Sequence, residues 1–163
     1  MFAKVISPKQ TNQSTKVDKL VYSCQVNTTP FTSKTQMEKR QQLVEAALTL
    51  FYQRSVHSVG INDVLVQAKV ARKTLYHHFD SKEALLLAAL QLRDQRWCDW
   101  LQQRLAPASS LNDLIKRLFD ALDDWFNERD LAPFYGCFFQ QCASEYSQSD
   151  SDVWLYCHQH QQR

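Results

Sequence analysis

Residues that interrupt helices are scarce in this sequence, which contains two glycines and four prolines among 163 residues. Leucine, alanine and glutamine are abundant instead, and all three favour helices. The apolar fraction of 44% and the aromatic fraction of 12% suit a globular protein with a packed core rather than a disordered chain. The composition therefore predicts an all-α fold.

Long apolar runs are also missing. The longest run, Ala84 to Leu90, is far shorter than the ~20 residues that a membrane-spanning helix needs. Lys4 and Lys9 near the amino terminus are not followed by the apolar stretch of a signal peptide. We therefore expect a cytoplasmic protein that has no membrane partner.

Motifs for catalysis or metal binding are a third absence. No glycine-rich phosphate loop, nucleophile elbow or metal-binding helix motif occurs, so the sequence predicts neither an enzyme nor a bound cofactor. The five cysteines form no CxxC pair, and in a reducing compartment we expect them to be free thiols that fill apolar space. Cys157, His158 and His160 lie close together in the sequence, but nothing completes a metal site around them, so we expect no metal.

Charge is distributed unevenly, although the formal net charge is only +2. Residues 1–35 carry a net charge of +4, residues 36–82 carry +3, residues 83–119 carry +1, and residues 120–163 carry −6. A basic first half and an acidic last quarter are expected when one end of a protein meets a polyanion. Short windows also segregate charge by chance, so the gradient supports a nucleic-acid partner without establishing one.

The spacing of apolar residues divides the chain into three parts. Residues 1–35 show no sustained period and are expected to be a flexible extension, which is a basic arm, an inert tail, or sequence upstream of the true start. Residues 36–80 predict three helices, and residues 81–163 predict a further helical domain that is incomplete. The expected helices are Gln36 to Arg54, Ile61 to Ala68, Ala71 to His77, Lys82 to about Leu105, one capped by Ser110, Tyr135 to Tyr146, and one starting near Asp152.

The second and third expected helices form a helix-turn-helix. A small apolar core can hold them at a fixed angle, and its members are Ile61, Val64, Leu65, Ala68, Val70, Leu75 and Phe79. The side chains that remain to project from the third helix are Arg72, Lys73, Thr74, Tyr76 and His77. Such a helix fits the major groove of double-stranded DNA, with its first residues nearest the base edges. A basic helix alone is equally compatible with an ordinary solvated surface. The neighbouring sequence is therefore needed to distinguish a DNA-binding helix from such a surface.

Residues 40–90 closely resemble the DNA-binding domain of the TetR (tetracycline-repressor-like) family of transcription regulators. The resemblance is carried by AALTLF at 46–51, by TLYHHFDSKEALLLAAL at 74–90, and by the spacing between them, which needs no gap. A weaker resemblance continues through YGCFFQQCASEYS at 135–147, which looks like the start of a common pattern in the family's effector domain. The resemblance implies a sequence-specific transcription regulator, most often a repressor that a small-molecule effector releases from DNA.

The resemblance also implies which side chains contact DNA. Arg72, Lys73 and Tyr76 are the expected contacts near the bases, and the first two can donate to guanine O6 and N7. Contacts with the phosphates are implied for Thr74, Tyr76, His77 and Lys82.

The sequence departs from the family pattern at several positions. Ser55 and Lys69 stand where glycine is usual, and a left-handed conformation would strain Lys69 by about 1 kcal/mol relative to glycine. Ala71 replaces the usual serine at the start of the recognition helix, and the usual capping residue near Val59 and Gly60 is missing. These departures lower the expected stability without removing the helix-turn-helix.

Aromatic residues are concentrated in the second helical unit, where the resemblance implies an effector pocket. The candidate lining residues are Trp97, Trp100, Trp125, Phe126, Phe134, Tyr135, Phe138 and Phe139. An aromatic interior suits a planar or apolar ligand, although ordinary core packing accounts for most residues selected in this way.

Finally, the resemblance implies a homodimer that binds a palindromic operator in double-stranded DNA. Family members normally continue with two long helices that form the dimer interface, and the 163 residues end before them, which leaves dimerisation of this form open. The rival interpretation is a helical protein–protein interaction module that retains the helix-turn-helix as a scaffold. Salt-dependent DNA binding separates the two interpretations, because phosphate contacts release counterions.

Overall fold

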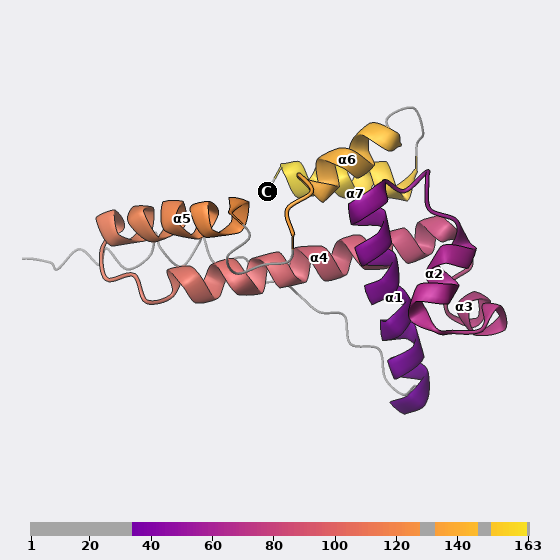
Figure 1. The fold of residues 1–163 in the computed structure, drawn as a ribbon. Helices are drawn as coiled ribbons and strands as arrows, with labels where there is room; N and C mark the ends of the chain where they lie inside the picture. Colours follow the sequence, from indigo (N-terminus) through magenta and orange to yellow (C-terminus); the bar gives the residue numbers. More distant parts are fainter. Residues whose placement is uncertain (1–33, 128–132, 147–150, 163) are drawn as a thin grey trace, which may run out of the picture.

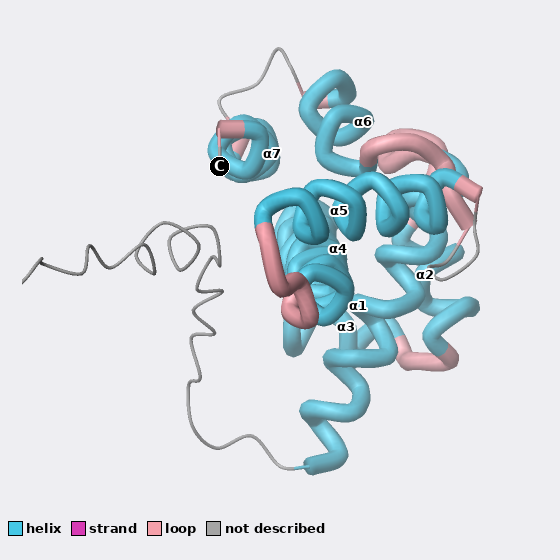
Figure 2. The backbone as a smooth tube through the Cα atoms, turned by 90° about the vertical axis from the view of Figure 1, so that its left-hand side faces the viewer, coloured by secondary structure: helices cyan, strands magenta, loops and turns pink. Residues whose placement is uncertain are grey.

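The computed structural model describes residues 34–127, 133–146 and 151–162, and every regular element in these ranges is an α-helix (Figure 2). The described helices are α1 (Lys34–Arg54), α2 (Ile61–Ala68), α3 (Arg72–His78), α4 (Lys82–Leu105), α5 (Leu111–Phe126), α6 (Phe138–Glu145) and α7 (Asp152–Gln161). The predicted all-α class, with a helix-turn-helix followed by further helices, is confirmed. The expected extension over residues 1–35 lies outside the described residues, apart from Lys34 and Thr35 at the start of α1.

Serine side chains define where three of the helices begin. Ser81, Ser110 and Ser151 precede α4, α5 and α7, and each hydroxyl accepts a hydrogen bond from the backbone N–H three residues later at 3.0–3.2 Å. α6 is shorter than the sequence predicted. Gly136 has a φ of +93°, which a right-handed helix cannot include, so the expected start at Tyr135 moves to Phe138.

The longest helix, α4, connects the two ends of the molecule (Figure 1). At one end α1 packs across α4, with α2 and α3 on the far side of α1, and at the other end α5 runs back alongside α4. α6 and α7 pack on each other, and α7 also packs on α4. α1 therefore lies between α4 and the pair of short helices α2 and α3.

One continuous core joins the helix-turn-helix to the later helices. Phe51 of α1, Leu75 of α3 and Leu85 of α4 are completely buried, and α6 and α7 add Phe138 and Cys157 to the same cluster. The small core predicted for the helix-turn-helix is present, with Val64, Ala68, Val70, Leu75 and Phe79 buried and with Ile61 and Leu65 packed against them. The orientation of α3 is thus fixed by the same contacts that hold the whole fold.

The apolar stripe of α5 is only partly buried. Leu111, Ile115 and Phe119 follow one another at intervals of four residues and are 70%, 45% and 65% exposed. Ala121 is the buried residue of this helix. The amphipathic pattern is therefore present, but one edge of it packs against nothing in the described part of the chain.

The prediction for the cysteines is confirmed only in part within the described ranges. Cys142 and Cys157 are buried in the core, whereas Cys98 is half-buried and Cys137 is exposed, so Cys137 does not fill apolar space. Among the described residues, no three histidine, cysteine, aspartate or glutamate side chains gather as a metal site would require. None of the described helices combines the length and apolar character needed to cross a bilayer.

Candidate nucleic-acid interface

The third helix exposes one polar face and buries the opposite side. At 100° per residue, four of the predicted DNA contacts fall within an arc of about 140°, and all four are exposed: Arg72, Lys73, Tyr76 and His77. Leu75 on the opposite side of α3 is completely buried. Thr74, also predicted, is half-buried and lies about 60° beyond the exposed arc. The structure therefore gathers five of the six predicted contact residues on α3.

Neighbouring helices support this face. Arg72 donates from Nη2 to Oδ1 of Asn62 at 2.5 Å, which braces the guanidinium against the first turn of α2. A shallow hollow of about 330 Å³ lies between α1 and α3, and its lining includes Lys39, Lys73 and His77. Sequence analysis did not identify Lys39, because its charge belongs to this surface only once α1 packs beside α3.

The turn of the helix-turn-helix has a left-handed backbone at Lys69, as expected for a position where the family usually has glycine. Lys69 adopts the left-handed conformation with φ 54° and ends α2. The N–H of Val70 then donates to the carbonyl of Leu65 at 3.2 Å, which reverses the chain into α3. At the start of α2, Gly60 has no side chain to cap the helix, and Asp63 makes the reciprocal bond of a capping box by accepting from the N–H of Gly60 at 2.8 Å.

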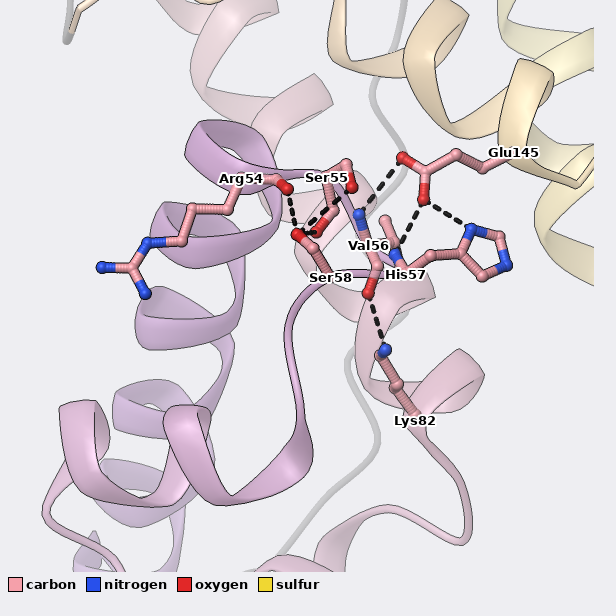
Figure 3. A network of polar contacts seen from close by, with 7 residues as sticks. All are labelled: Arg54, Ser55, Val56, His57, Ser58, Lys82 and Glu145. Atoms are coloured by element: carbon pink, nitrogen blue, oxygen red, sulfur yellow. Dashed lines mark hydrogen bonds and ion pairs between the residues drawn. The ribbon is translucent and has the colours of Figure 1, made fainter.

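A carboxylate from the second half of the chain closes the loop between α1 and α2 (Figure 3). Ser55, with φ 71°, ends α1 in the left-handed conformation, and the next two backbone N–H groups then meet the end of α6. Glu145 accepts hydrogen bonds from the N–H of Val56 at 3.1 Å and from the N–H of His57 at 2.8 Å. Its Oε2 also lies 2.7 Å from Nδ1 of His57. One side chain of α6 therefore holds the loop that leads into α2.

Lys82 meets the same loop from the start of α4. Its Nζ donates to the carbonyl of Val56 at 2.6 Å and lies 5.7 Å from the ring centre of Phe51 (Figure 3). Burial lowers the pKa of Lys82 below its ordinary value, and nearby carboxylates, with Glu145 foremost, oppose this effect. The ammonium group is thus engaged within the protein, unlike the side chains on α3.

Tyr52 makes a second connection between α1 and the segment before α6. Its hydroxyl donates to the carbonyl of Gly136 at 2.8 Å and accepts a hydrogen bond from the N–H of Tyr135 at 3.1 Å. Neither this pairing nor that of Glu145 was found by sequence analysis. The partners lie more than 80 residues apart, and a single sequence carries no signal that pairs them.

Replacing Glu145 with alanine should lower the free energy of unfolding by about 1.5–3 kcal/mol, because two backbone donors lose a charged acceptor. Glu145→Gln should lose less, since an amide oxygen still accepts one of the two bonds. Urea-induced unfolding followed by circular dichroism measures both changes. Glu38→Ala, at an exposed position of α1, is the control and should stay within about 0.5 kcal/mol of the parent. A Glu145→Ala variant as stable as this control would contradict the bracing role.

His78, beside the predicted contact face, should make stability fall in mild acid. Burial lowers the pKa of His78 below 6.5, and the charges of His77 and Arg40 add to this effect. The unfolded chain therefore takes up the proton at higher pH than the folded chain, so stability contributed by the neutral ring is present above pH 6.5 and declines as pH falls below it. Thermal unfolding from pH 7.5 to 5 should show a weaker decline for His78→Gln. The exposed control His158→Gln should retain the parental decline.

The aromatic residues predicted for an effector pocket fall into two neighbouring groups. In the first group, between α4 and α5, the ring centre of Trp97 lies 5.1 Å from that of Trp100 and 4.2 Å from that of Trp125. Phe126 and Phe134 pack on Trp125 with ring centres at 5.2 and 5.0 Å. The first group is therefore a contiguous aromatic cluster.

The second group surrounds Tyr52 of α1, which sequence analysis did not identify. The rings of Tyr135 and Phe138 lie 5.3 and 5.6 Å from that of Tyr52. Phe139 faces elsewhere and stacks on His160 at 3.6 Å. The predicted set thus forms two aromatic clusters, while Phe139 belongs to the packing of α6 on α7.

Comparison with known proteins places these features in a family. Residues 43–89 match the family model described as bacterial regulatory proteins, tetR family. The chain is 32% identical over 88 residues to the HTH-type transcriptional activator FasR of Mycolicibacterium smegmatis, covering 54% of this chain and 40% of that protein. It is 31% identical over 102 residues to the HTH-type transcriptional repressor KstR2 of the same organism, covering 58% of this chain and 48% of the relative. The chain spans less than half the length of these two relatives.

A solved structure shares the fold over a longer stretch. The crystal structure of a TetR-family transcriptional regulator from Streptomyces coelicolor aligns with a TM-score of 0.68 at 29% sequence identity. The alignment covers 78% of this chain and 66% of the other. With a helix-turn-helix that matches the family model, and a fold shared well beyond it, this chain carries the DNA-binding domain of the TetR family of bacterial regulatory proteins.

Proposed function

We propose that this protein is a sequence-specific transcription regulator that inserts α3 into the major groove of double-stranded DNA. The observation that carries the proposal is the exposed polar face of α3. Leu75 and Phe79, which are buried in the core, hold this helix in place. Arg72 and Lys73 lie at the start of this helix, where a recognition helix comes closest to base edges. The remaining proposed contacts, to bases or phosphates, are Thr74, Tyr76 and His77.

Lys82 has a different place in the proposed interface. Its Nζ donates to the carbonyl of Val56 in the α1–α2 loop. We therefore assign Lys82 an electrostatic contribution to phosphate binding rather than a direct contact. The exposed lysine Lys73 and the partly exposed Lys39 beside it supply charge at the surface itself.

We further propose that residues 36–80 are the DNA-binding domain and that residues 81–163 serve effector binding and dimerisation. The protein would act in the cytoplasm as a homodimer on a palindromic operator, and a small-molecule effector would release it, so that it represses transcription. The contacts of Glu145 and Tyr52 with the end of α1 support such coupling, because they join the second part of the chain to the loop before α2. The named relatives include both a repressor and an activator, and repression is the sign that we propose.

The test combines the mass in solution, measured by light scattering, with DNA binding at a series of salt concentrations. A dimer that selects palindromic sites should lose about 10³–10⁵ in affinity between 50 and 200 mM salt if it makes 6–10 phosphate contacts. A monomer that binds all DNA alike, at about 10⁻⁴–10⁻⁶ M, would remove the dimeric operator from the proposal. A folded protein without DNA affinity at low salt would overturn the proposal as a whole and leave a protein–protein interaction module in its place.

A further inference from the structure

Arg93, in the middle of α4, is a buried charge without a counter-ion among the described residues. Its side chain lies in the core with 9% of the residue exposed, and no described carboxylate, carbonyl or hydroxyl oxygen accepts a hydrogen bond from its guanidinium. The next residue, Asp94, is engaged elsewhere with Tyr156 and His160. An arginine stays protonated at any pH that a folded protein tolerates, so Arg93 cannot escape its burial by becoming neutral.

Aromatic rings flank the Arg93 guanidinium on two sides. Its central carbon lies 5.3 Å from the ring centre of Tyr52 in α1 and 5.9 Å from that of Trp125 in α5. Arg93 is therefore the point at which the two aromatic groups meet, one around Tyr52 and the other around Trp97 and Trp125. The rings offset part of the cost of burying the charge, but they satisfy none of its five N–H donors.

A second buried donor lies in the same region. The indole N–H of Trp125 is inaccessible to solvent and has no hydrogen-bond acceptor, and the indole N–H of Trp100 in the same ring cluster is in the same state. Buried donors are almost always paired in folded proteins. A solvent-inaccessible indole N–H without an acceptor, near a nine-tenths buried guanidinium without a described counter-ion, forms a donor set that an acceptor from outside the chain would satisfy.

We propose that Arg93 and the indole N–H of Trp125 bind the carboxylate of an aromatic monocarboxylic acid, whose ring packs among Tyr52, Trp97 and Trp125. A carboxylate matches the planar fork of arginine with two parallel hydrogen bonds and leaves an oxygen lone pair for the indole. Phosphate matches the same fork, so inorganic phosphate is compared with benzoate below. The aromatic surroundings favour a ligand whose remainder is apolar and planar over a free inorganic ion.

The proposed ligand would be the effector of the proposed function. The inference rests on that function only for the effect of the ligand on DNA binding. Tyr52 touches the Arg93 guanidinium with its ring, while its hydroxyl joins α1 to Gly136 before α6. A carboxylate that draws the guanidinium away from this ring would shift the same contacts that position the end of α1. Ligand binding and DNA binding are measured separately below, so that either can fail without the other.

The probe is benzoate, with benzamide as a neutral compound of the same shape, and calorimetric titration without DNA gives both affinities. Benzoate should bind saturably and at least about tenfold more tightly than benzamide, since the guanidinium interacts with the charge. Arg93→Met should remove this preference and weaken benzamide much less than benzoate, since the amide oxygen accepts only a hydrogen bond to a neutral group. Trp125→Phe keeps a ring and removes the N–H, and should weaken benzoate binding by about two- to tenfold.

Folding is checked for each variant by its thermal midpoint. Arg93→Met should unfold no earlier than the parent, because an apolar side chain of similar length replaces an uncompensated buried charge. Arg93→Lys is the second variant; it keeps the charge but loses the planar fork, and its benzoate affinity should fall between those of Arg93→Met and the parent. DNA affinity without benzoate should stay within twofold of the parent in all three variants, whether or not the regulator responds to this ligand.

Several results would overturn the assignment of a carboxylate site. They are equal affinity for benzoate and benzamide, unchanged benzoate affinity in Arg93→Met, tighter binding of inorganic phosphate than of benzoate, or no saturable binding of benzoate, phenylacetate or octanoate. A tenfold gain in benzoate affinity in a Glu128→Gln, Asp130→Asn double variant would also overturn it, since a carboxylate of the chain itself would then be the natural occupant. Loss of DNA binding by the parent protein would contradict the proposed function alone.

Discussion

Replacing Phe51 with alanine is expected to lower the free energy of unfolding by about 3–5 kcal/mol. The ring is completely buried in α1, in the cluster that joins the helix-turn-helix to α4 and α6. Water gains little from entering the apolar space that the ring leaves. The loss of stability therefore combines the transfer free energy of the ring with the cost of the cavity. A domain of this size has only about 5–15 kcal/mol of stability in total, so the variant should be largely unfolded in mild denaturant.

The chain provides a control of the same residue type. Phe119 on α5 is 65% exposed, and Phe119→Ala should change the stability by no more than about 0.5 kcal/mol. Urea titration of both variants, with the slope against urea compared as well as the midpoint, separates lost stability from a changed unfolded state. If Phe119→Ala is as damaging as Phe51→Ala, the exposed face of α5 is covered in solution and the described packing is incomplete there.

The helices could be predicted from the sequence because their signals are local. The apolar spacing around Leu43 and Phe51 marks α1, and the capping serines before α4, α5 and α7 mark their starts. The left-handed turn at Lys69 could be predicted from the glycine that usually stands there in the family. The start of α6 was placed three residues too early, because the positive φ of Gly136 occurs where Tyr52 binds the carbonyl of Gly136 and the N–H of Tyr135, a long-range pairing that the local pattern does not contain.

The site residues divide in the same way. The face of α3 follows from the 3.6-residue period, so Arg72, Lys73, Tyr76 and His77 could be chosen before the fold was known. Residues whose importance arises from tertiary contacts could not be chosen. Glu145 resembles any helix-end carboxylate in the sequence, and Arg93 resembles any exposed arginine of an amphipathic helix. Arg93 stands out only because the fold buries it, and Glu145 stands out only because its hydrogen-bond partner lies 89 residues away in the sequence.

Arg72→Ala is expected to weaken binding to the cognate operator by about 5- to 150-fold and to relax the preference at one base pair of each half-site. A bidentate contact of arginine with guanine is worth about 1–3 kcal/mol of discrimination against other bases. The geometry fits such a role, because Arg72 begins α3 and Asn62 already holds its guanidinium outside the core. Binding to random DNA should change little, since that affinity depends on phosphate contacts.

Two variants of neighbouring residues distinguish base recognition from a general loss of charge. His77→Ala should weaken cognate and random DNA alike, because the proposed contact of His77 is with a phosphate. Asn62→Ala removes the 2.5 Å brace without removing the guanidinium, so it should weaken specific binding less than Arg72→Ala and leave the base preference in place. Selection from a pool of randomised duplexes, followed by titration of the best and of unrelated sequences, measures both quantities. Equal losses on cognate and random DNA for Arg72→Ala would assign the guanidinium to the phosphates, and base recognition would then have to come from Lys73 and Tyr76.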